Sequence, residues 1–486
     1  MMNDLTRTPD WVKNAIFYQI FPDRFAKSEH LEKPTHIEPW HSPLTRFGFK
    51  GGDLLGVYEK LDYLQDLGIT ALYFNPIFAS AANHRYHTFD YYQVDPILGG
   101  NKAYFKLLEE AHRRGMHIVL DGVFNHASRG FFQFHHILEN GEKSPYLDWF
   151  SVYGFPMNAY QGKPNYSAWW NLPALPQFNT DNPQVRDFLL GVAQYWIEKG
   201  ADGWRLDVPF EIKDETFWRQ FRKVTKEPNP EAYLVGEIPS EAQEWLEGDM
   251  FDGVMNYQFS AACVGFFGAG SRDEGMIAGM MGLPEVPELD AAAFAHRTKE
   301  LLEIYPRQNA LAQLNLMDSH DMPRFLSMVS GNRAAFKLAT LFQMTYPGAP
   351  CIYYGNEIGM MGGRDPECRA PFNWDESQWD HELRNLIQTF THIRLEHNVL
   401  RTGEYVPIFA EGRRLAYLRH LEGQRMLILI NAGDGSWEFN LPINGHFPDG
   451  VTFDGLLGGD GAVIEDGHLR KGTLPPWQGE ILKPED

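Results

Sequence analysis

Eight short stretches rich in apolar, β-branched and aromatic residues recur along the first three quarters of the chain. Each is followed by a polar or glycine-bearing loop, and most intervals carry apolar residues at helical spacing, as in residues 57–64 and 104–115. Strands that alternate with helices pair in parallel. The pattern therefore predicts an α/β fold, a (β/α)8 (TIM) barrel, whose usual length is about 250 residues. The predicted strands are Ala15–Ile20, Ile69–Phe74, His117–Val123, Gly203–Val208, Tyr233–Ile238, Gly253–Tyr257, Leu311–Leu316 and Pro350–Tyr354.

The interval between the third and fourth predicted strands is longer than a barrel needs. Their first residues are 86 positions apart, whereas one strand–helix unit takes roughly 30 residues. Residues 127–180 fill this interval and are rich in aromatic rings amid glycine, proline and asparagine. Because loops that follow strands lie at the carboxyl ends of the strands, we expect an inserted loop subdomain on the catalytic side. The barrel would then comprise residues 1–126 and 181–398.

The pattern changes after about residue 398. Residues 415–419, 426–431 and 437–440 are strand-like, and the turns around them are rich in glycine and aspartate. Successive short strands joined by tight turns favour antiparallel pairing. We therefore expect residues 399–486 to form a C-terminal antiparallel β-sandwich.

Composition narrows the classes of partner. The 486 residues include 43 Lys and Arg against 64 Asp and Glu, and the net charge of −21 disfavours nucleic acid and anionic membranes as partners. Neutral or cationic ligands remain. Sugars are often held by stacking on rings, but the 14% aromatic content taken alone is more often core than site. Three cysteines without a CxxC pair exclude a disulfide scaffold and a thiolate zinc site. The chain has no apolar leader and no apolar run of about 18 residues, so we expect a cytoplasmic protein.

Acidic residues and histidines gather where the predicted strands end. Functional groups of a barrel collect at the carboxyl ends of its strands, so we expect these side chains to share one site. They are Asp121 and His126 at and after the third strand, Asp207 in the fourth, Glu237 in the fifth, and His320 and Asp321 after the seventh.

Two of these acids suit different chemical roles. Arg205 and Asp207 are two residues apart in a strand, so their side chains share a face, and a fixed guanidinium would keep the carboxylate ionised. Glu237 has apolar neighbours, and burial would raise its pKa so that it can donate a proton. One ionised and one protonated carboxyl group is the arrangement of glycoside hydrolysis. Asp321 would hydrogen-bond to sugar hydroxyls.

Each of these residues alone also has a purely structural interpretation. Asp121 could cap a helix, and Arg205 with Asp207 could form a structural ion pair. Single histidines such as His126 and His320 are more often satisfied core residues. Joint placement of the required residue types at four strand ends favours a catalytic site over these separate explanations.

The strand-end segments follow the order of four motifs of a known family. Residues 121–126, 203–208, 236–237 and 319–321 resemble the motifs of the α-amylase family, glycoside hydrolase family thirteen. Residues 11–25 and 83–88 resemble the beginning of the barrel in the cyclomaltodextrinase, neopullulanase and maltogenic amylase subgroup. The resemblance extends from about residue 11 to the end of the chain.

The resemblance implies a retaining mechanism with a role for each position. Asp207 corresponds to the nucleophile, Glu237 to the general acid/base and Asp321 to the residue that stabilises the transition state. The other corresponding positions are Asp121 (the structural acid of the first motif), Tyr86, His126, Arg205 and His320 around the reacting sugar, and Asp365 and Arg369 at the next sugar toward the non-reducing end.

The sequence also departs from the subgroup. About ten residues precede the first strand motif, where the subgroup carries an extra β-sandwich, so we expect a monomer or a dimer that does not use that domain. Phe210 lies just after the nucleophile position, and an aromatic acceptor side would admit longer or branched glucans. Trp169, a ring that taken alone is more often core packing, is included with Phe210 among the predicted substrate contacts. Residues 26–30 lack the acidic cluster of a calcium loop, so we expect no required metal and no cofactor.

The resemblance implies hydrolysis of α-glucans. We expect cleavage of α-1,4 bonds in cyclodextrins, maltodextrins or pullulan, with α-1,6 bonds as further substrates and transfer to another sugar as a side reaction. A debranching enzyme that prefers α-1,6 links and an exo-acting α-glucosidase remain alternatives, because the motifs alone do not separate them. A non-catalytic glucan-binding scaffold is disfavoured, since such proteins typically lose one or more of the three acids.

Overall fold

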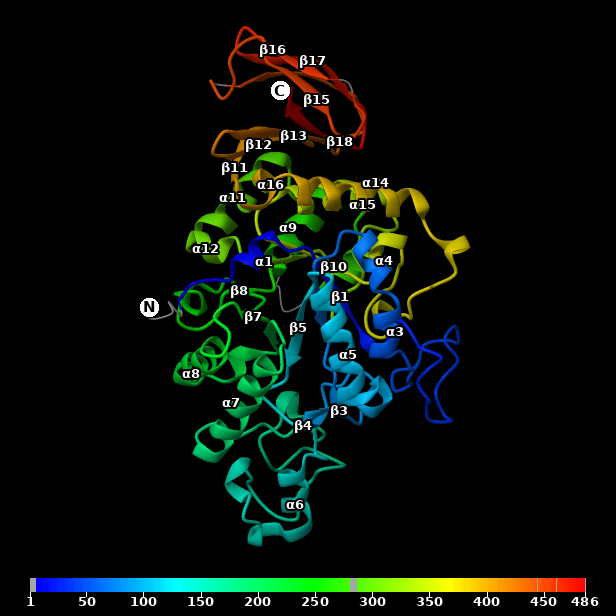
Figure 1. The fold of residues 1–486 in the computed structure, drawn as a ribbon, viewed down its shortest axis with the longest axis vertical. Coiled ribbons are helices and arrows are strands. Elements are labelled where there is room, and N and C mark those ends of the chain that lie inside the picture. Colours follow the sequence, from blue (N-terminus) through cyan, green and yellow to red (C-terminus); the bar gives the residue numbers. More distant parts are fainter. Residues whose placement is uncertain (1–5, 280–285, 444, 460, 486) are drawn as a thin grey trace.

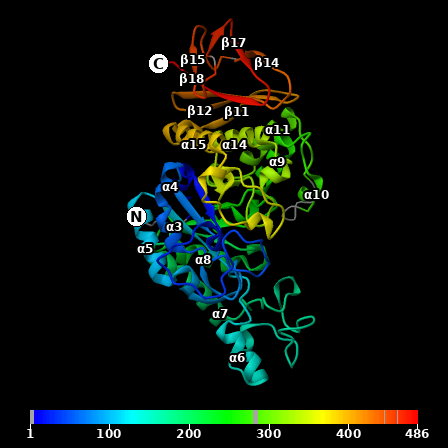
Figure 2. The same ribbon diagram turned by 90° about the vertical axis from the view of Figure 1, so that its right-hand side faces the viewer.

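The chain folds into a central barrel with a small irregular unit at one end and a layered β-sheet unit at the opposite end (Figure 1; Figure 2). The computed structural model describes residues 6–279, 286–443, 445–459 and 461–485. Within these ranges, no helix is long and apolar enough to cross a membrane.

Eight parallel strands form the barrel, in the order β8-β7-β6-β5-β2-β1-β10-β9. A parallel bridge between Met255 and Leu314 closes the ring, and the amide of Asn256 donates to the carbonyl oxygen of Leu314 at 2.9 Å. All eight predicted barrel strands are present, which confirms the predicted (β/α)8 barrel. Their bounds are β1 (Phe17–Ile20), β2 (Ala71–Phe74), β5 (His117–Gly122), β6 (Gly203–Leu206), β7 (Tyr233–Gly236), β8 (Gly253–Val254), β9 (Leu314–Leu316) and β10 (Ala349–Tyr353).

Most of these strands are shorter than the sequence pattern predicts, and β8 and β9 are shortened most, by three residues each. β8 ends at Val254, because the Asn256 side chain accepts a hydrogen bond from the amide of Phe259 at 3.0 Å and so begins a helix. β9 begins at Leu314, because residues 307–310 form a helical turn for which Leu311 is the cap.

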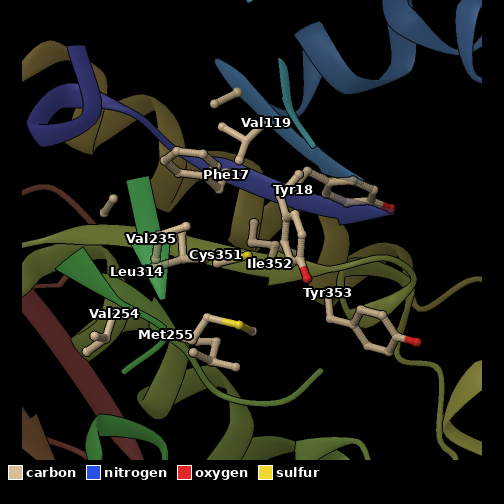
Figure 3. Close-up of a cluster of buried hydrophobic side chains, with 14 of the residues drawn as sticks. Phe17, Tyr18, Val119, Val235, Val254, Met255, Leu314, Cys351, Ile352 and Tyr353 are labelled. Atoms are coloured by element: carbon tan, nitrogen blue, oxygen red, sulfur yellow. The ribbon is translucent and has the colours of Figure 1, made fainter. Parts of the chain in front are cut away.

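The barrel strands are buried on both faces. Every residue of β1, β2, β6 and β7 is buried, which is typical of parallel sheets covered by helices. A polar residue on such a strand therefore needs a specific partner. The apolar side chains of several strands meet in the core (Figure 3), among them Phe17, Tyr18, Val119, Val235, Leu314 and Cys351.

Helices connect the strands and cover the outside of the barrel. Side-chain caps fix where several of them begin: Asn182 accepts from the amide of Gln184 at 2.8 Å, and Asp214 accepts from the amide of Thr216 at 2.9 Å. The helices are α1 (Asp10–Asn14), α2 (Pro22–Phe25), α3 (Leu54–Glu59), α4 (Leu61–Asp66), α5 (Gly100–Arg113), α7 (Pro183–Glu198), α8 (Glu215–Lys226), α9 (Tyr257–Phe267), α10 (Glu274–Ile277), α11 (Ala291–Glu303), α12 (Arg307–Ala310), α13 (Phe325–Met328), α14 (Arg333–Thr345), α15 (His381–Glu396) and α16 (Asn398–Thr402).

The chain between β5 and α7 forms the irregular unit, which carries α6 (Phe132–Asn140) at its far end (Figure 1). Aromatic rings make its interior: Phe134 contacts Phe150 and Tyr166, each at 5.0 Å between ring centroids. An isolated bridge between His126 and Gln177 joins the unit to the end of β5. The aromatic residues noted in the sequence therefore include both packing rings and rings near the strand ends.

The last part of the chain forms one antiparallel sheet that folds over a second core. Its strands lie in two layers (Figure 1), with Phe439, Phe453 and Ile464 among the buried residues of that core. This arrangement agrees with the predicted sandwich. The strands are β11 (Glu404–Glu411), β12 (Arg414–Leu421), β13 (Gln424–Asn431), β14 (Trp437–Pro442), β15 (Thr452–Gly455), β16 (Ala462–Glu465), β17 (His468–Leu474) and β18 (Gln478–Pro484), in the order β11-β12-β13-β18-β15-β16-β17-β14.

Candidate active site

Arg205 lies at the centre of the candidate site, fully buried on β6. Its Nη1 donates to Asp121 Oδ1 at 2.9 Å and to Asp207 Oδ1 at 3.0 Å. Its Nη2 lies 2.6 Å from Glu237 Oε1. The three acids belong to the ends of β5, β6 and β7, which are neighbours in the sheet. One guanidinium thus joins three acids that the sequence placed at separate strand ends.

The pKa values of Asp207 and Glu237 both rise. Burial raises the pKa of Glu237 to about 7, although the charge of Arg205 opposes the rise. Burial and the charge of Glu237 raise the pKa of Asp207 well above its usual range, and Arg205 again opposes the change. The rise at Glu237 agrees with the sequence prediction. Arg205 favours the ionised form of Asp207, as the sequence prediction expected, but burial and the charge of Glu237 oppose it.

Asp321 has a different environment. Its side chain is 29% exposed, against 9% for Asp207 and 4% for Glu237. Asp321 Oδ2 lies 2.8 Å from His320 Nε2, and its Oδ1 accepts from Arg369 Nη2 at 2.9 Å. Burial favours the protonated form, but the charges of His320 and Arg369 and the hydrogen bond to His320 outweigh it and lower the pKa of Asp321. Asp321 is therefore ionised at neutral pH.

Tyr86 connects the first acid with His320. It lies in the connection of a hairpin, β3 (Phe78–Ser80) and β4 (Thr88–Val94). Its hydroxyl donates to Asp121 Oδ2 at 2.8 Å and lies 2.7 Å from His320 Nε2. The two rings stack at 5.5 Å with an interplanar angle of 7°. Burial raises the pKa of Tyr86, so its hydroxyl remains a donor.

Arg369 and Asp365 lie together beside Asp321. Arg369 Nη1 is 3.2 Å from Asp365 Oδ1, and Arg369 Nε donates to the carbonyl oxygen of His320 at 2.8 Å. The guanidinium also lies over the ring of Phe21, 5.6 Å from its centroid. These contacts hold Arg369 in place, whereas the Asp365 side chain remains 44% exposed and accessible to a ligand.

His126 and Trp169 are brought together where the irregular unit meets the barrel. Their rings stack at 5.3 Å and 18°. Burial lowers the pKa of His126 to about 3, so the imidazole is neutral above that pH. Asn125 Nδ2 lies 3.2 Å from His126 Nδ1. A neutral imidazole held in this way can exchange hydrogen bonds with hydroxyl groups without adding charge.

Phe210 borders a pocket that adjoins Glu237. Ile238 and Pro239, which directly follow Glu237 in the chain, line the same pocket, and Trp245 forms part of its wall. The ring of Trp245 stacks on Phe251 at 5.3 Å and 10°, which fixes its orientation. The pocket has a volume of about 510 Å³, within the usual range of small-ligand sites. Its other lining residues are Lys213, Glu215, Ser240, Glu244 and Met250.

Three polar residues of the site were not predicted. Gln19 Nε2 lies 2.9 Å from His320 Nδ1, and Asn75 Nδ2 donates to the Tyr86 hydroxyl at 3.1 Å. The hydroxyl of Tyr73 donates to Asp121 Oδ2 at 3.0 Å. All three lie within or just after the buried strands β1 and β2. A polar group within or just after a buried apolar run is the signal that could have identified them.

The loop of residues 26–53 contains lysine ammonium groups among its oxygen atoms. Lys50 Nζ donates to the carbonyl oxygens of Pro39 at 3.2 Å and Ser42 at 2.9 Å, and Lys33 Nζ lies 2.8 Å from Asp53 Oδ2. Across the described ranges, no group of three or more His, Cys, Asp or Glu side chains is arranged to hold a metal ion. The donor set of this loop suits ammonium groups better than a calcium ion, which needs six to eight oxygen ligands.

A (β/α)8 barrel with carboxylates, a buried arginine and histidines at its strand ends defines a glycoside hydrolase of the barrel type. The sequence matches the catalytic domain of α-amylase over residues 19–389 and the neopullulanase-like C-terminal domain over residues 405–481. The chain therefore belongs to the α-amylase family of glycoside hydrolases, as the motif resemblance indicated.

Named relatives include proteins with several activities. A cyclomaltodextrinase of Bacillus sp. is 44% identical over 432 residues, which are 88% of this chain and 74% of that protein. The intracellular maltogenic amylase of Bacillus subtilis (strain 168) is 33% identical over 476 residues, 96% of this chain and 77% of the relative. The native structure of the Nostoc punctiforme debranching enzyme superposes with a TM-score of 0.90 at 45% identity, covering 98% of this chain and 99% of that one.

Proposed function

We propose that the protein hydrolyses α-glucans with retention of configuration, with Asp207 as the nucleophile and Glu237 as the acid and base. The observation that carries the proposal is the contact of one buried guanidinium, Arg205, with both carboxyl groups. In the first step Asp207 attacks the anomeric carbon while Glu237 gives its proton to the departing oxygen. In the second step water attacks the glycosyl ester and gives a proton to Glu237.

The raised pKa values of Asp207 and Glu237 support one shared proton at the pair, which the first step requires. Two carboxyl groups with raised pKa values that share one guanidinium hold a proton between them over part of the pH range. The donor contacts of Arg205 orient one oxygen of Asp207 and leave the other for attack. Asp321, ionised beside this pair, would stabilise the positive charge of an oxocarbenium-like transition state.

The remaining predicted contacts surround this centre. Tyr86 and His320, with stacked rings, would bind the reacting sugar together with His126. Asp365 and Arg369 lie beside Asp321 and would hold the next sugar toward the non-reducing end. The neutral imidazole of His126 and the protonated hydroxyl of Tyr86 provide hydrogen bonds without a full charge, which suits a neutral sugar.

The pocket bordered by Phe210 supports a substrate with an extended leaving group. Ile238 and Pro239 line this pocket and directly follow Glu237, the proposed donor to the departing oxygen, so we propose that the leaving group extends toward the pocket. We propose α-1,4 bonds of cyclodextrins, maltodextrins and pullulan as substrates, together with α-1,6 bonds. A preference for α-1,6 branch links is the second candidate, favoured by this pocket and by the likeness to a debranching enzyme over nearly its whole length.

We also propose a cytoplasmic location and a monomeric or dimeric state. The name of the Bacillus subtilis relative includes intracellular, which supports the location. Cys263, Cys351 and Cys368 are buried free thiols, a state that persists in a reducing compartment. Light scattering at several protein concentrations would determine the oligomeric state.

The mechanism is tested by Asp207→Asn. The variant should lose turnover of maltodextrin, because an amide cannot form the glycosyl ester. Circular dichroism should show an intact fold, and Asp62→Asn, at an acid with an 89% exposed side chain, is the matched control. Near-normal turnover by the Asp207 variant would overturn the assignment of the nucleophile.

The linkage preference is tested by product analysis. Wild-type protein is incubated with pullulan, β-cyclodextrin and a branched maltooligosaccharide. Panose or maltose from pullulan indicates α-1,4 cleavage, and maltotriose indicates α-1,6 cleavage. Rapid removal of branches with little opening of β-cyclodextrin would replace the first candidate by the debranching alternative.

A further inference from the structure

Three rings are stacked in a row from the active site toward solvent. His126 stacks on Trp169 at 5.3 Å and 18°, and Trp169 stacks on Trp170 at 4.5 Å and 9°. His126 is 1% exposed and lies at the end of β5, whereas Trp170 is 75% exposed. The row therefore begins at the reacting centre and ends in an accessible indole face. The mechanism proposed above makes no use of Trp170.

The backbone that presents this indole is strained. Trp170 has φ 50° and ψ 26°, and the next residue, Asn171, has φ 55°. Left-handed backbone is unfavourable for a residue with a bulky side chain. Hydrogen bonds hold the turn in this form, because the amides of Asn171 and Leu172 donate to the carbonyl oxygens of Ala168 and Trp169 at 3.1 and 2.9 Å. Strain that is kept without burying the side chain points to a use for the exposed ring.

Local packing does not account for this arrangement. Burying the Trp170 ring would remove a large apolar area from water, yet most of it stays accessible. The indole N–H of Trp169 is also buried without a hydrogen-bond partner among the described residues. An open aromatic face suits a ligand with one apolar face and a polar edge that stays in water.

A glucosyl residue has these properties. Its C–H groups form an apolar face, and its hydroxyls accept and donate hydrogen bonds at the rim. The continuous stack to His126 places such a residue on the same chain that enters the active site, and a neutral chain suits a protein of net charge −21. A second protein copy is the other partner that an exposed tryptophan could contact, and the experiment below distinguishes it.

We propose that Trp170 forms an outer subsite that binds a glucosyl residue of the substrate chain beyond those held at the catalytic centre, so that the protein favours longer chains. The inference rests on the proposed α-glucan hydrolysis and deepens it by assigning a chain-length determinant. Trp170 touches no reacting atom, so it is a binding residue rather than a catalytic one.

The test compares Trp170→Ala with wild type on maltotriose and on a long maltooligosaccharide or amylose. The variant should lose about 2- to 12-fold in kcat/KM on the long chain, through KM, and little on maltotriose. Trp170→Phe should recover most of the loss, because it restores a ring. Tyr153→Ala is the matched control: its ring is equally exposed (71%) in the same irregular unit, but its hydroxyl hydrogen-bonds to Ser167 at 2.5 Å.

Quenching of tryptophan fluorescence by maltoheptaose gives a readout independent of turnover. Weaker quenching and binding in Trp170→Ala would support the subsite even if wild type hydrolysed no glucan, an outcome that would contradict only the proposed function. Equal losses on short and long chains, no loss at all, or a change in oligomeric state instead of chain-length preference would each overturn the subsite.

Discussion

At the scale of single residues, Arg205 makes the proton affinities of the site interdependent. Its guanidinium contacts Asp121, Asp207 and Glu237. Its positive charge opposes the rise in pKa that burial causes at Asp207 and Glu237. Removing or neutralising one acid therefore changes the share of this charge that the others receive. The pH dependence of activity therefore reports the coupled ionisation of these acids rather than the ionisation of one carboxyl group.

Activity should fall as the pH rises through about 7. Glu237 has a pKa raised to about 7, and above this pH it loses the proton that the departing oxygen requires. The measurement is kcat/KM on maltodextrin across the range from about pH 5 to pH 9, with the folded state checked at each end. A profile that stays flat to about pH 9 would contradict the assignment of Glu237 as the acid.

Glu237→Gln should be less active by about 10²- to 10⁴-fold yet more stable at alkaline pH. Because folding raises the pKa of Glu237 from 4.5 to about 7, the folded protein binds more protons than the unfolded chain between these values. The free energy of unfolding therefore decreases as the pH rises through this window, by on the order of 3 kcal/mol. Glu237→Gln removes this loss of unfolding free energy, because glutamine does not ionise.

Thermal unfolding of both proteins at about pH 4.5 and pH 8 measures the effect. The two midpoints should nearly agree at the lower pH, where the carboxyl is protonated in the folded protein and about half protonated in the unfolded chain, and separate at the higher pH. A variant that is less stable than wild type at pH 8 would show that the ion pair with Arg205 outweighs the cost of burying the charge.

At the scale of the elements, the closure of the barrel depends on the short strand β8. A Cβ atom added to Gly253 would lie 2.2 Å from the carbonyl oxygen of Ala312, a backbone atom. The same carbonyl accepts from the Tyr233 hydroxyl at 2.6 Å, so it is held in place. Glycine is required here because β8 and the chain before β9 approach closely.

Gly253→Ala should therefore destabilise the protein by about 1–3 kcal/mol, the usual cost of overpacking. The thermal midpoint measures the loss. Gly435→Ala is the control, because a Cβ atom at that position meets no atom within 4 Å. Equal midpoints for the two variants would mean that the contact between β8 and the chain before β9 adapts without cost.

The sequence predicted the elements whose signal is local. Each barrel strand is a continuous apolar run, so all eight were found. The hairpin β3–β4 was not, because burial along β4 recurs at every third residue, at Thr88, Tyr91 and Val94, rather than at every second, and register shifts interrupt its pairing. The alternation that identifies a half-buried strand is therefore missing.

The residues of the candidate site also divide into those with a local sequence signal and those without one. Asp121, Asp207, Glu237 and Asp321 were placed from residue type and strand-end position alone. Gln19 could not be, because its partner His320 is 301 residues away in the chain and a single sequence carries no sign of that contact. The raised pKa of Asp207 was missed for a similar reason, since it depends on burial and on the charge of Glu237, which lies at another strand end.

At the scale of the whole molecule, two buried arginines lie where the barrel meets the C-terminal sheet, and one of them, Arg419, joins the two parts. Arg394 of α15 donates to the carbonyl oxygens of Met344 at 2.8 Å and Leu400 at 3.0 Å. Arg419 of β12 donates to Leu400 at 2.9 Å and also to Thr345, the last residue of α14. Carbonyl groups at the end of a helix carry partial negative charge, which favours both cations there.

Arg419→Met should loosen this junction. The carbonyl groups that Arg419 now satisfies would remain buried without a donor, at a cost of about 2 kcal/mol or more. The thermal midpoint should fall, and limited proteolysis should release the C-terminal sheet earlier than in wild type. Arg414→Met on the same strand is the control, because Arg414 donates within the sheet unit, to Ser436 at 3.3 Å; similar proteolysis of the two variants would contradict the role of Arg419.

The hydrogen bond from Tyr73 to Asp121 offers a route for enzyme engineering. Tyr73 lies on β2, behind the groups that would face a sugar, and its hydroxyl stabilises the negative charge of Asp121. Without this hydrogen bond, Asp121 would interact more strongly with Arg205, and the positive charge of Arg205 would stabilise ionised Glu237 less. A substitution at Tyr73, which is 1% exposed, should therefore shift the pH optimum of the proposed glucan hydrolysis.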